Sequence, residues 1–170
     1  RVCMALLATN LTLNKEKYEF HRETLKFYGH LFSKRGMKPE PKKVKALSDT
    51  PCPGDVSDLR SFLGMASYCD CYIKDYATIS YPLRELTRQG QPFLWSSACE
   101  RAFSKIKTIV ASATNLAYFN PRRKTELTVD ASPVGLGAIL AQYQKEDVPR
   151  HIVAYVSRSL TDTEKAYSQA

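Results

Sequence analysis

The sequence lacks the features that mark several classes of protein. No apolar run approaches the ~20 residues that a membrane-spanning helix needs, and we expect no membrane partner. The basic and then apolar first residues, RVCMALLATNLTLN, lack the small-residue cleavage site of a signal peptide. There is also no initiator methionine, so we expect the chain to be part of something longer.

Cysteine and histidine are too few and too scattered for a structural metal or disulfide framework. The five cysteines include no Cys-x-x-Cys pair, and none of the three histidines is paired at metal-ligand spacing. These absences argue against a secreted disulfide scaffold and against a zinc ribbon. We expect reduced thiols, as in a cytosolic or nuclear protein.

Positive charge is present in excess. Lys and Arg number 25 against 17 Asp and Glu, a formal net charge of +8, while 44% of the residues are hydrophobic. The composition is that of a globular chain, and its 170 residues suffice for one ordinary domain or two small ones. The charge favours a polyanionic partner, nucleic acid before an anionic membrane; a merely soluble basic protein is the alternative.

The first quarter of the chain is expected to form strands. Residues 11–37 alternate apolar and polar side chains and predict two or three short antiparallel strands, with Gly29 and Gly36 at turns or bulges. Pro39 and Pro41 are expected to close this strand region.

Residues 41–90 are expected to form a small helical unit. Pro41 suits the first turn of one helix, Ser57 is expected to cap the next, and Pro82 to open another that Gly90 stops.

The second half of the chain predicts a helix followed by strands. Residues 91–95 form an aromatic hinge, and residues 96–111 have the periodicity of an amphipathic helix. The strand candidates are ELTVDAS, GLGAILAQYQ and RHIVAYVSRSL, with KEDVP as the turn between the last two. Thr161 and Glu164 match a capping box, so a further helix is expected to begin there.

Asp130 is the most conspicuous single residue, because a carboxylate on a central strand is costly to bury without a partner or a metal. The alternative is structural: an Asp at the end of a strand that accepts amide hydrogen bonds from Ser132 or Val134. Spacing alone favours that alternative, since a two-metal nuclease site needs several converging carboxylates. Alternation puts Leu127 and Val129 on one face and Asp130 on the other. We expect the apolar face to pack on helices, leaving Asp130 to point outward.

Gly135-Leu-Gly137 resembles part of a dinucleotide-binding fingerprint but lacks the third glycine, since Leu140 stands there. The expected role of these glycines is to let two backbones approach closely within a sheet.

Residues 15–45 are the strongest candidate for a binding surface. They contain ten Lys and Arg against four Glu, a balance of +6 (10 − 4), with aromatic residues interleaved. This mixture suits a groove that grips a phosphate backbone while aromatic faces pack or stack. A solvated face over an aromatic core is an equally good interpretation. The aromatic residues are Tyr18, Phe20, Phe27, Tyr28 and Phe32.

Eight motifs occur in an order and spacing that resemble the polyprotein of Ty3/gypsy-type LTR retrotransposons, downstream of the polymerase centre. They are LTLNKEKYEF, FYGHLFSKRGMKPEPKKVKAL, LRSFLGMASYC, YATISYPLREL, FLW with CERAFSKIK, LAYF, TVDASPVGLGAIL and VAYVSRSLTDTEKAYSQ. The resemblance covers essentially the whole chain.

The resemblance implies four segments and an α/β fold: palm-end strands, a small helical thumb, and an incomplete RNase H-like mixed sheet. Residues 1–40 would end the reverse transcriptase palm, and residues 41–90 would form the thumb. Residues 91–121 would be a hinge and linker helix, and residues 122–170 the N-terminal half of an RNase H-like domain.

The resemblance also implies site residues. Asp130 matches the first metal-binding carboxylate of the RNase H site, with Mg²⁺ as the cofactor of the complete parent enzyme, which overrides the structural interpretation. Phe27, Gly29 and His30 match the strand pair that holds the primer terminus. The expected phosphate-binding side chains are Lys34, Arg35, Lys42, Lys43 and Lys45. The partner would be an RNA–DNA hybrid or a template–primer duplex.

The implied function is a fragment of a reverse transcriptase and ribonuclease H. The sequence contains no Asp-Asp pair, so the isolated chain is expected to be inactive as a polymerase. It is also expected to be inactive as a nuclease, because the single carboxylate of Asp130 should bind Mg²⁺ very weakly. The sequence departs from the family pattern at one place in the thumb. Asp70 stands where Arg or Lys is common in the family, and an acid there would weaken duplex binding. The alternative is a domesticated or relic module that binds nucleic acid without catalysis.

Overall fold

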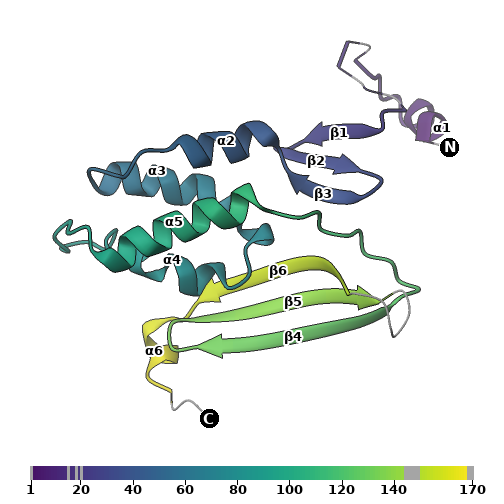
Figure 1. Cartoon of the computed structure of the whole chain (residues 1–170). Coiled ribbons are helices and arrows are strands. Elements are labelled where there is room, and N and C mark those ends of the chain that lie inside the picture. The colour runs from purple at the N-terminus through teal and green to yellow at the C-terminus, as the bar shows by residue number, and fades with distance from the viewer. Residues whose placement is uncertain (1, 15, 18, 20, 144–149, 168–170) are drawn as a thin grey trace.

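The computed structural model describes residues 2–14, 16, 17, 19, 21–143 and 150–167 (Figure 1). It confirms an α/β fold with two separate three-stranded antiparallel sheets and helices between them. Lys15, Tyr18 and Phe20 of the basic stretch, and the predicted KEDVP turn, lie outside the described residues.

The N-terminal sheet follows a short helix, α1 (Val2–Ala8). Its strands are β1 (Thr24–Phe27), β2 (His30–Ser33) and β3 (Gly36–Pro39), which pair in that order. The strands begin later than predicted and include Pro39. Tyr28 and Gly29, at φ 45° and 66°, turn the chain between β1 and β2, and Gly36 at φ 118° turns it into β3, as predicted for the two glycines.

The helical unit contains α2 (Pro41–Asp49), α3 (Val56–Ser67) and α4 (Tyr76–Glu85), with a 3-10 turn η1 (Asp70–Tyr72) between the last two. Helix α5 (Ser97–Ala111) is capped by Ser96 and packs against α2 and α4. Figure 1 shows it running between the other helices. The core therefore lies among these four helices.

Two predicted helix starts are wrong. Asp55, not Ser57, caps α3: its carboxylate accepts a 2.8 Å hydrogen bond from the Asp58 amide. Pro82 lies inside α4, which begins six residues earlier, after Asp75 in the left-handed region at φ 56°. The buried face of α4 offsets the hydrogen bond that Pro82 cannot donate; it consists of Tyr76, Ala77, Ser80 and Leu83.

The C-terminal sheet contains β4 (Lys124–Ser132), β5 (Gly135–Tyr143) and β6 (His151–Ser159) in sequence order, as the strand patterns predicted. Asp130 pairs with Gly137. The predicted capping box of Thr161 and Glu164 is present at α6 (Asp162–Lys165).

The prediction that the apolar face of β4 packs on helices is wrong, although Asp130 is exposed as expected. Leu127 and Val129 are 63% and 64% exposed, so their apolar face is open. The other face meets α4: the Ser157 hydroxyl accepts from the Ala77 amide at 3.0 Å, and Ser132 bonds to Thr78 at 2.8 Å. Alternation sorts side chains onto two faces but does not specify which face a helix covers.

The glycines of β5 allow this helix to approach. A methyl group added at Gly135 would lie 3.2 Å from the Ala77 side chain, and one added at Gly137 would collide with the Asp75 carboxylate. We predicted that these glycines let two backbones approach closely within the sheet. Gly135 does lie close to the Arg158 carbonyl of β6, but both glycines also make room for the start of α4.

Candidate nucleic-acid interface

The turn between β1 and β2 presents two aromatic rings to solvent. Phe27 and Tyr28 are 55% and 78% exposed, and their rings meet edge to face with centroids 4.5 Å apart. The positive φ of Tyr28 and Gly29 produces a tight turn that carries the rings at its end. Exposed rings on a fixed turn suit contact with bases or sugars.

His30 faces the helical unit instead of solvent. Its Nδ1 lies 2.9 Å from the Tyr72 hydroxyl, and its ring stacks on Tyr68 with centroids 5.1 Å apart and an interplanar angle of 16°. Burial lowers the pKa of His30 below its ordinary value of 6.5, which favours the neutral ring. Within the fold His30 therefore holds the turn against the helices.

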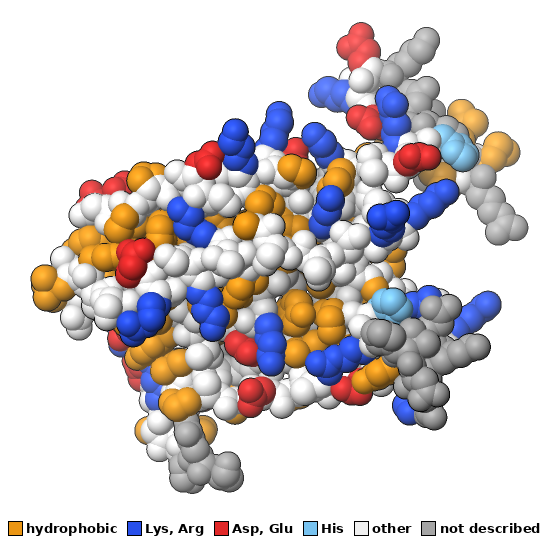
Figure 2. Space-filling view, viewed as in Figure 1, with side chains coloured by type: hydrophobic (Ala, Val, Ile, Leu, Met, Phe, Trp, Pro, Cys, Tyr) orange, Lys and Arg blue, Asp and Glu red, His pale blue; other side chains and the backbone are white. Residues whose placement is uncertain are grey.

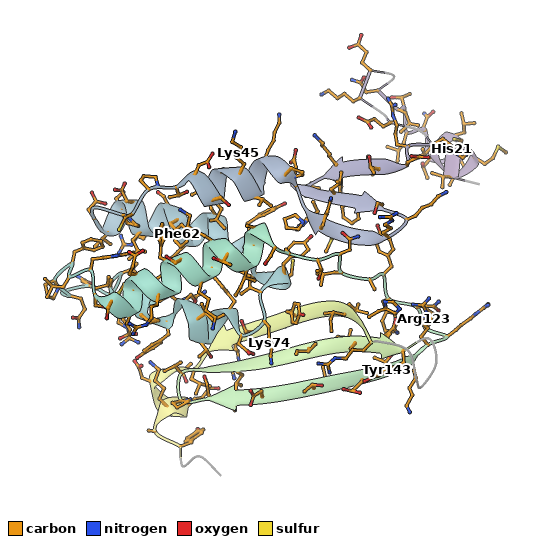
Figure 3. All side chains as sticks on the ribbon, in the orientation of Figure 1. His21, Lys45, Phe62, Lys74, Arg123 and Tyr143 are labelled. Carbon is orange, nitrogen blue, oxygen red and sulfur yellow. The ribbon has the colours of Figure 1, made fainter. Side chains whose placement is uncertain are left out.

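The predicted basic residues lie on two surfaces. Lys34 and Arg35 form the exposed turn between β2 and β3, whereas Lys42, Lys43 and Lys45 lie exposed along α2. Figure 3 shows Lys45 on the outer side of α2, away from Phe62 among the helices. Figure 2 shows Lys and Arg side chains along this edge and again near the start of β4.

Not every cation of the basic stretch is free to bind phosphate. The Lys26 ammonium lies 3.6 Å from the Glu40 carboxylate, and the Lys43 ammonium lies 5.7 Å from the centroid of the Tyr68 ring. The structure thus brings Phe27, Gly29 and His30 together, and it leaves Lys42 and Lys45 with their charges directed to solvent.

Asp130 lies within β4 and is exposed. Its Oδ1 accepts a 2.9 Å hydrogen bond from the Ala131 amide. The Val134 amide, which the structural interpretation gave to Asp130, donates instead to the Ser132 hydroxyl at 3.4 Å, and the Gly135 amide donates to the same hydroxyl at 3.0 Å. The Asp130 carboxylate is therefore not used by the turn.

The described residues do not by themselves form a metal centre. Among them no group of three or more His, Cys, Asp or Glu side chains is placed to hold a metal ion. Asp75, at the start of α4, places its carboxylate against Gly137, the strand partner of Asp130. The Lys74 ammonium lies 3.8 Å from Asp75. One or two carboxylates are too few for a two-metal site.

Sequence reasoning missed three residues that organise the interface. Tyr68 and Tyr72 hold His30, and Asp75 joins the helical unit to the sheet beside Asp130. Only Gly137 offered a signal for the last contact, since a glycine inside a strand marks a close approach. Asp70, the acidic departure, is exposed at the first position of η1.

The second half of the chain matches a protein family. Residues 95–170 match the family described as "RNase H-like domain found in reverse transcriptase". Such domains generally use divalent metal ions. None of the helices in the described part of the chain has the length and apolarity that a bilayer crossing requires.

Curated relatives match nearly the whole chain. It is 36% identical, over 98% of its length, to the retrovirus-related Pol polyprotein from transposon opus of Drosophila melanogaster. The Pol polyprotein from transposon gypsy of the same organism is 33% identical over 98%. The Tf2-3 polyprotein of Schizosaccharomyces pombe is 29% identical over 98%. The chain spans less than a fifth of these relatives, namely 18%, 17% and 12% of their lengths.

Solved structures share the fold. The foamy viral protease-reverse transcriptase dRH in complex with double-stranded DNA has a TM-score of 0.75 and 21% identity, over 98% of this chain and 29% of that one. The foamy viral protease-reverse transcriptase in complex with an RNA/DNA hybrid has a TM-score of 0.70 and 22% identity, over 90% of this chain and 21% of that one.

Proposed function

We propose that this chain, a reverse transcriptase–ribonuclease H segment of a Ty3/gypsy-type retroelement Pol polyprotein, grips an RNA–DNA hybrid or template–primer duplex. The observation that carries the proposal is the exposed lysine row of α2 beside the aromatic turn of β1 and β2. The structural neighbours, which are complexes with double-stranded DNA and with RNA/DNA hybrid, support the same partner.

Within that segment we assign residues 1–40 to the end of the palm, 41–90 to the thumb, 91–121 to the hinge and linker helix, and 122–170 to the start of the RNase H-like domain. Contacts of α4 with β5 and β6 would join the thumb helices to the sheet that carries Asp130.

Asp130 is proposed to supply one ligand of a divalent-ion site, Mg²⁺ in the complete parent enzyme. Such an ion polarises a phosphodiester and activates water for in-line hydrolysis. Mg²⁺ keeps most of its waters and gains little from a single carboxylate. We therefore derive no catalytic step for this chain, and we expect it to cleave no hybrid and extend no primer by itself. In a longer polyprotein that cleaves hybrids, Asp130→Asn is expected to abolish cleavage without unfolding the protein.

The salt dependence of binding tests the proposed contacts between the α2 lysines and the phosphates of the duplex. If about four to six phosphates are neutralised, log Kd plotted against log salt for a hybrid gives a slope of magnitude about 4 to 5. The double variant Lys42→Gln with Lys45→Gln should lower that magnitude by about 2, because two phosphate contacts are lost. Fluorescence anisotropy with a labelled hybrid measures both.

The matched control is Arg101→Gln with Lys105→Gln, which removes the same charge from exposed positions of α5. This control should retain the wild-type slope. A flat slope for the wild type would refute the proposal. An equal change in both double variants would show that Lys42 and Lys45 of α2 are not the specific phosphate contacts.

A further inference from the structure

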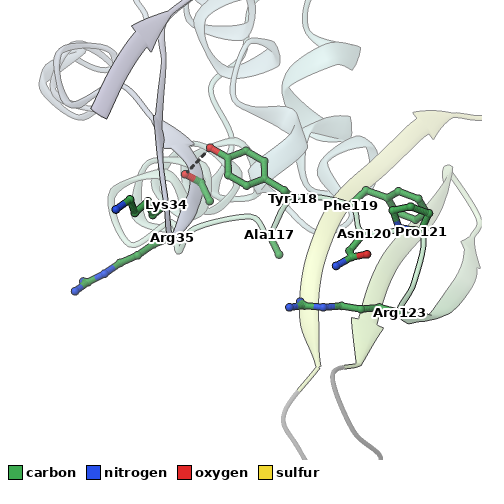
Figure 4. A pocket seen from close by; sticks show the side chains of 9 residues that line it. Lys34, Arg35, Ala117, Tyr118, Phe119, Asn120, Pro121 and Arg123 are labelled. Carbon is green, nitrogen blue, oxygen red and sulfur yellow. Dashed lines mark hydrogen bonds between the residues drawn. The ribbon is translucent and has the colours of Figure 1, made fainter. Parts of the chain in front are cut away.

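A cationic pocket lies where the turn between β2 and β3 meets the segment that leads into β4 (Figure 4). Its volume is about 340 Å³, within the range of small-ligand sites. Lys34 and Arg35 line one wall, and Tyr118, Phe119 and Arg123 line the other. The walls lie 83 positions apart in sequence, from Arg35 to Tyr118 (118 − 35), so the tertiary fold alone creates the pocket.

Hydrogen bonds hold the two walls together. The Tyr118 hydroxyl donates to the carbonyls of Ser33 at 2.9 Å and Gly36 at 3.3 Å. Met37 and Leu116 exchange backbone hydrogen bonds of 2.9 and 2.8 Å just behind the turn. The pocket is therefore pre-formed on its hairpin side.

Hydrogen bonds attach the wall that contains Tyr118, Phe119 and Arg123 to the C-terminal sheet. Gln142, only 1% exposed, accepts from the Asn120 amide and donates to the Asn120 carbonyl, each at 2.9 Å. A buried side chain that satisfies both backbone groups of Asn120 fixes the chain immediately before Arg123. A pre-formed site of this kind costs little conformational entropy when a ligand binds.

Positive charge predominates among the described residues of the pocket. Lys34, Arg35 and Arg123 contribute three cations, and none of the described lining residues is acidic. Across the described residues, no carboxylate forms an ion pair with these three side chains. In Figure 4 the Arg123 side chain extends toward the hairpin side that carries Arg35. An anionic group between the walls would relieve the mutual repulsion of these cations.

Two aromatic rings accompany the cations. Tyr118 is 48% exposed and Phe119 is 56% exposed, although each lines the cavity. Exposed rings beside a phosphate-binding group are the combination that single-stranded nucleic acids use, since an unpaired base can stack on a ring. Bases inside a duplex are already stacked on one another and cannot reach it.

We propose that this pocket binds one nucleotide of a single-stranded nucleic-acid segment, its phosphate against Lys34, Arg35 and Arg123 and its base against Phe119. The proposal rests on the proposed function and extends it, because the lysines of α2 would grip the duplex while the pocket takes a strand that leaves it. The ligand is thus a hybrid with a single-stranded extension.

The test compares two labelled ligands by fluorescence anisotropy: a blunt RNA–DNA hybrid, and the same hybrid with an extension of about six nucleotides. Wild-type chain should bind the extended hybrid about tenfold more tightly, given the strength of one stacked base and its phosphate contact. Phe119→Leu and Arg123→Gln should each remove most of that gain and leave the blunt affinity unchanged.

Matched controls are Tyr167→Leu, which removes a ring that is 67% exposed elsewhere, and Arg101→Gln on α5. Both should keep the full gain. A bromouracil in the extension should crosslink to the peptide that contains Phe119, as mass spectrometry will show.

The outcomes separate this inference from the proposed function. Equal affinity for blunt and extended hybrids overturns the pocket and leaves the duplex grip intact. A loss on both ligands in Phe119→Leu assigns the pocket to the duplex and likewise overturns the inference. No binding to either ligand overturns the proposed function as well.

Discussion

Helices α2–α5 bury their apolar faces against one another, whereas the sheet β4–β6 is covered mainly on the face that meets α4. Leu59, Phe62 and Ile106 in the helical unit are fully shielded from solvent. In the sheet, Ile139 is 7% exposed on the covered face, but Val129 and Val156 are 64% and 65% exposed on the open one. The helical unit is thus a closed core, and the sheet depends on one contact surface.

This difference shows that the number of apolar residues in an element does not predict how much they stabilise it. Burial contributes free energy in proportion to the apolar area removed from water, so an exposed valine contributes almost nothing. Substitutions in the closed core should therefore cost more than substitutions on the open face of the sheet.

Phe62→Ala should lower the free energy of unfolding by about 3–5 kcal/mol, because it leaves a cavity in the closed core. Phe62 is fully buried and packs on Phe103 with ring centroids 4.5 Å apart. Urea unfolding followed by circular dichroism measures the change. Leu94→Ala, at a position 69% exposed, is the control and should cost less than about 0.5 kcal/mol. Similar costs at both positions would show that the helical core is not closed.

Gly137→Ala should lower the free energy of unfolding by about 1–3 kcal/mol, because the added methyl group collides with the Asp75 carboxylate between helix and sheet. Gly64→Ala is the control: no atom lies within 4 Å of the added group, and alanine in a helix should stabilise by about 0.5–1 kcal/mol. Introducing Gly137→Ala into an Asp75→Gly background should cost less. An undiminished cost would show that Asp75 is not the obstacle.

Val129→Thr and Ile139→Thr compare the two faces of the sheet. The first should change the free energy of unfolding by less than about 0.5 kcal/mol, because its side chain is exposed. The second should cost about 1–3 kcal/mol, because it places a hydroxyl on the covered face. Thermal or urea unfolding of both variants tests this. Equal costs would contradict the difference between the covered and the open face.

The contact between His30 and the helical unit should make stability depend weakly on pH. Burial lowers the pKa of His30 below 6.5, so the unfolded state binds the proton more readily. Stability from this residue is then fully present above pH 6.5 and declines as pH falls through the lowered pKa. Unfolding of wild type and His30→Asn between pH 7.5 and about 5 should show a shallower decline in the variant. Identical pH profiles would contradict the role of His30.

Much of the local structure follows from the sequence alone, because short-range periodicity and caps act within a few residues. The amphipathic pattern of residues 96–111 predicted α5 with its Ser96 boundary, and the alternating runs predicted β4, β5 and β6. The reverse transcriptase–ribonuclease H resemblance also came from motifs in the sequence, and family and relatives confirm it.

Tertiary structure decided which faces meet and which distant residues share a site. Alternation placed Asp130 opposite Val129, but only the approach of α4 to Gly137 determined that the polar face is the covered one. Packing also lets α4 continue past Pro82, and it places Arg35 and Arg123 at the same pocket. Local pattern is set by neighbours along the chain, whereas burial is shared between segments far apart in sequence, so no single segment encodes it.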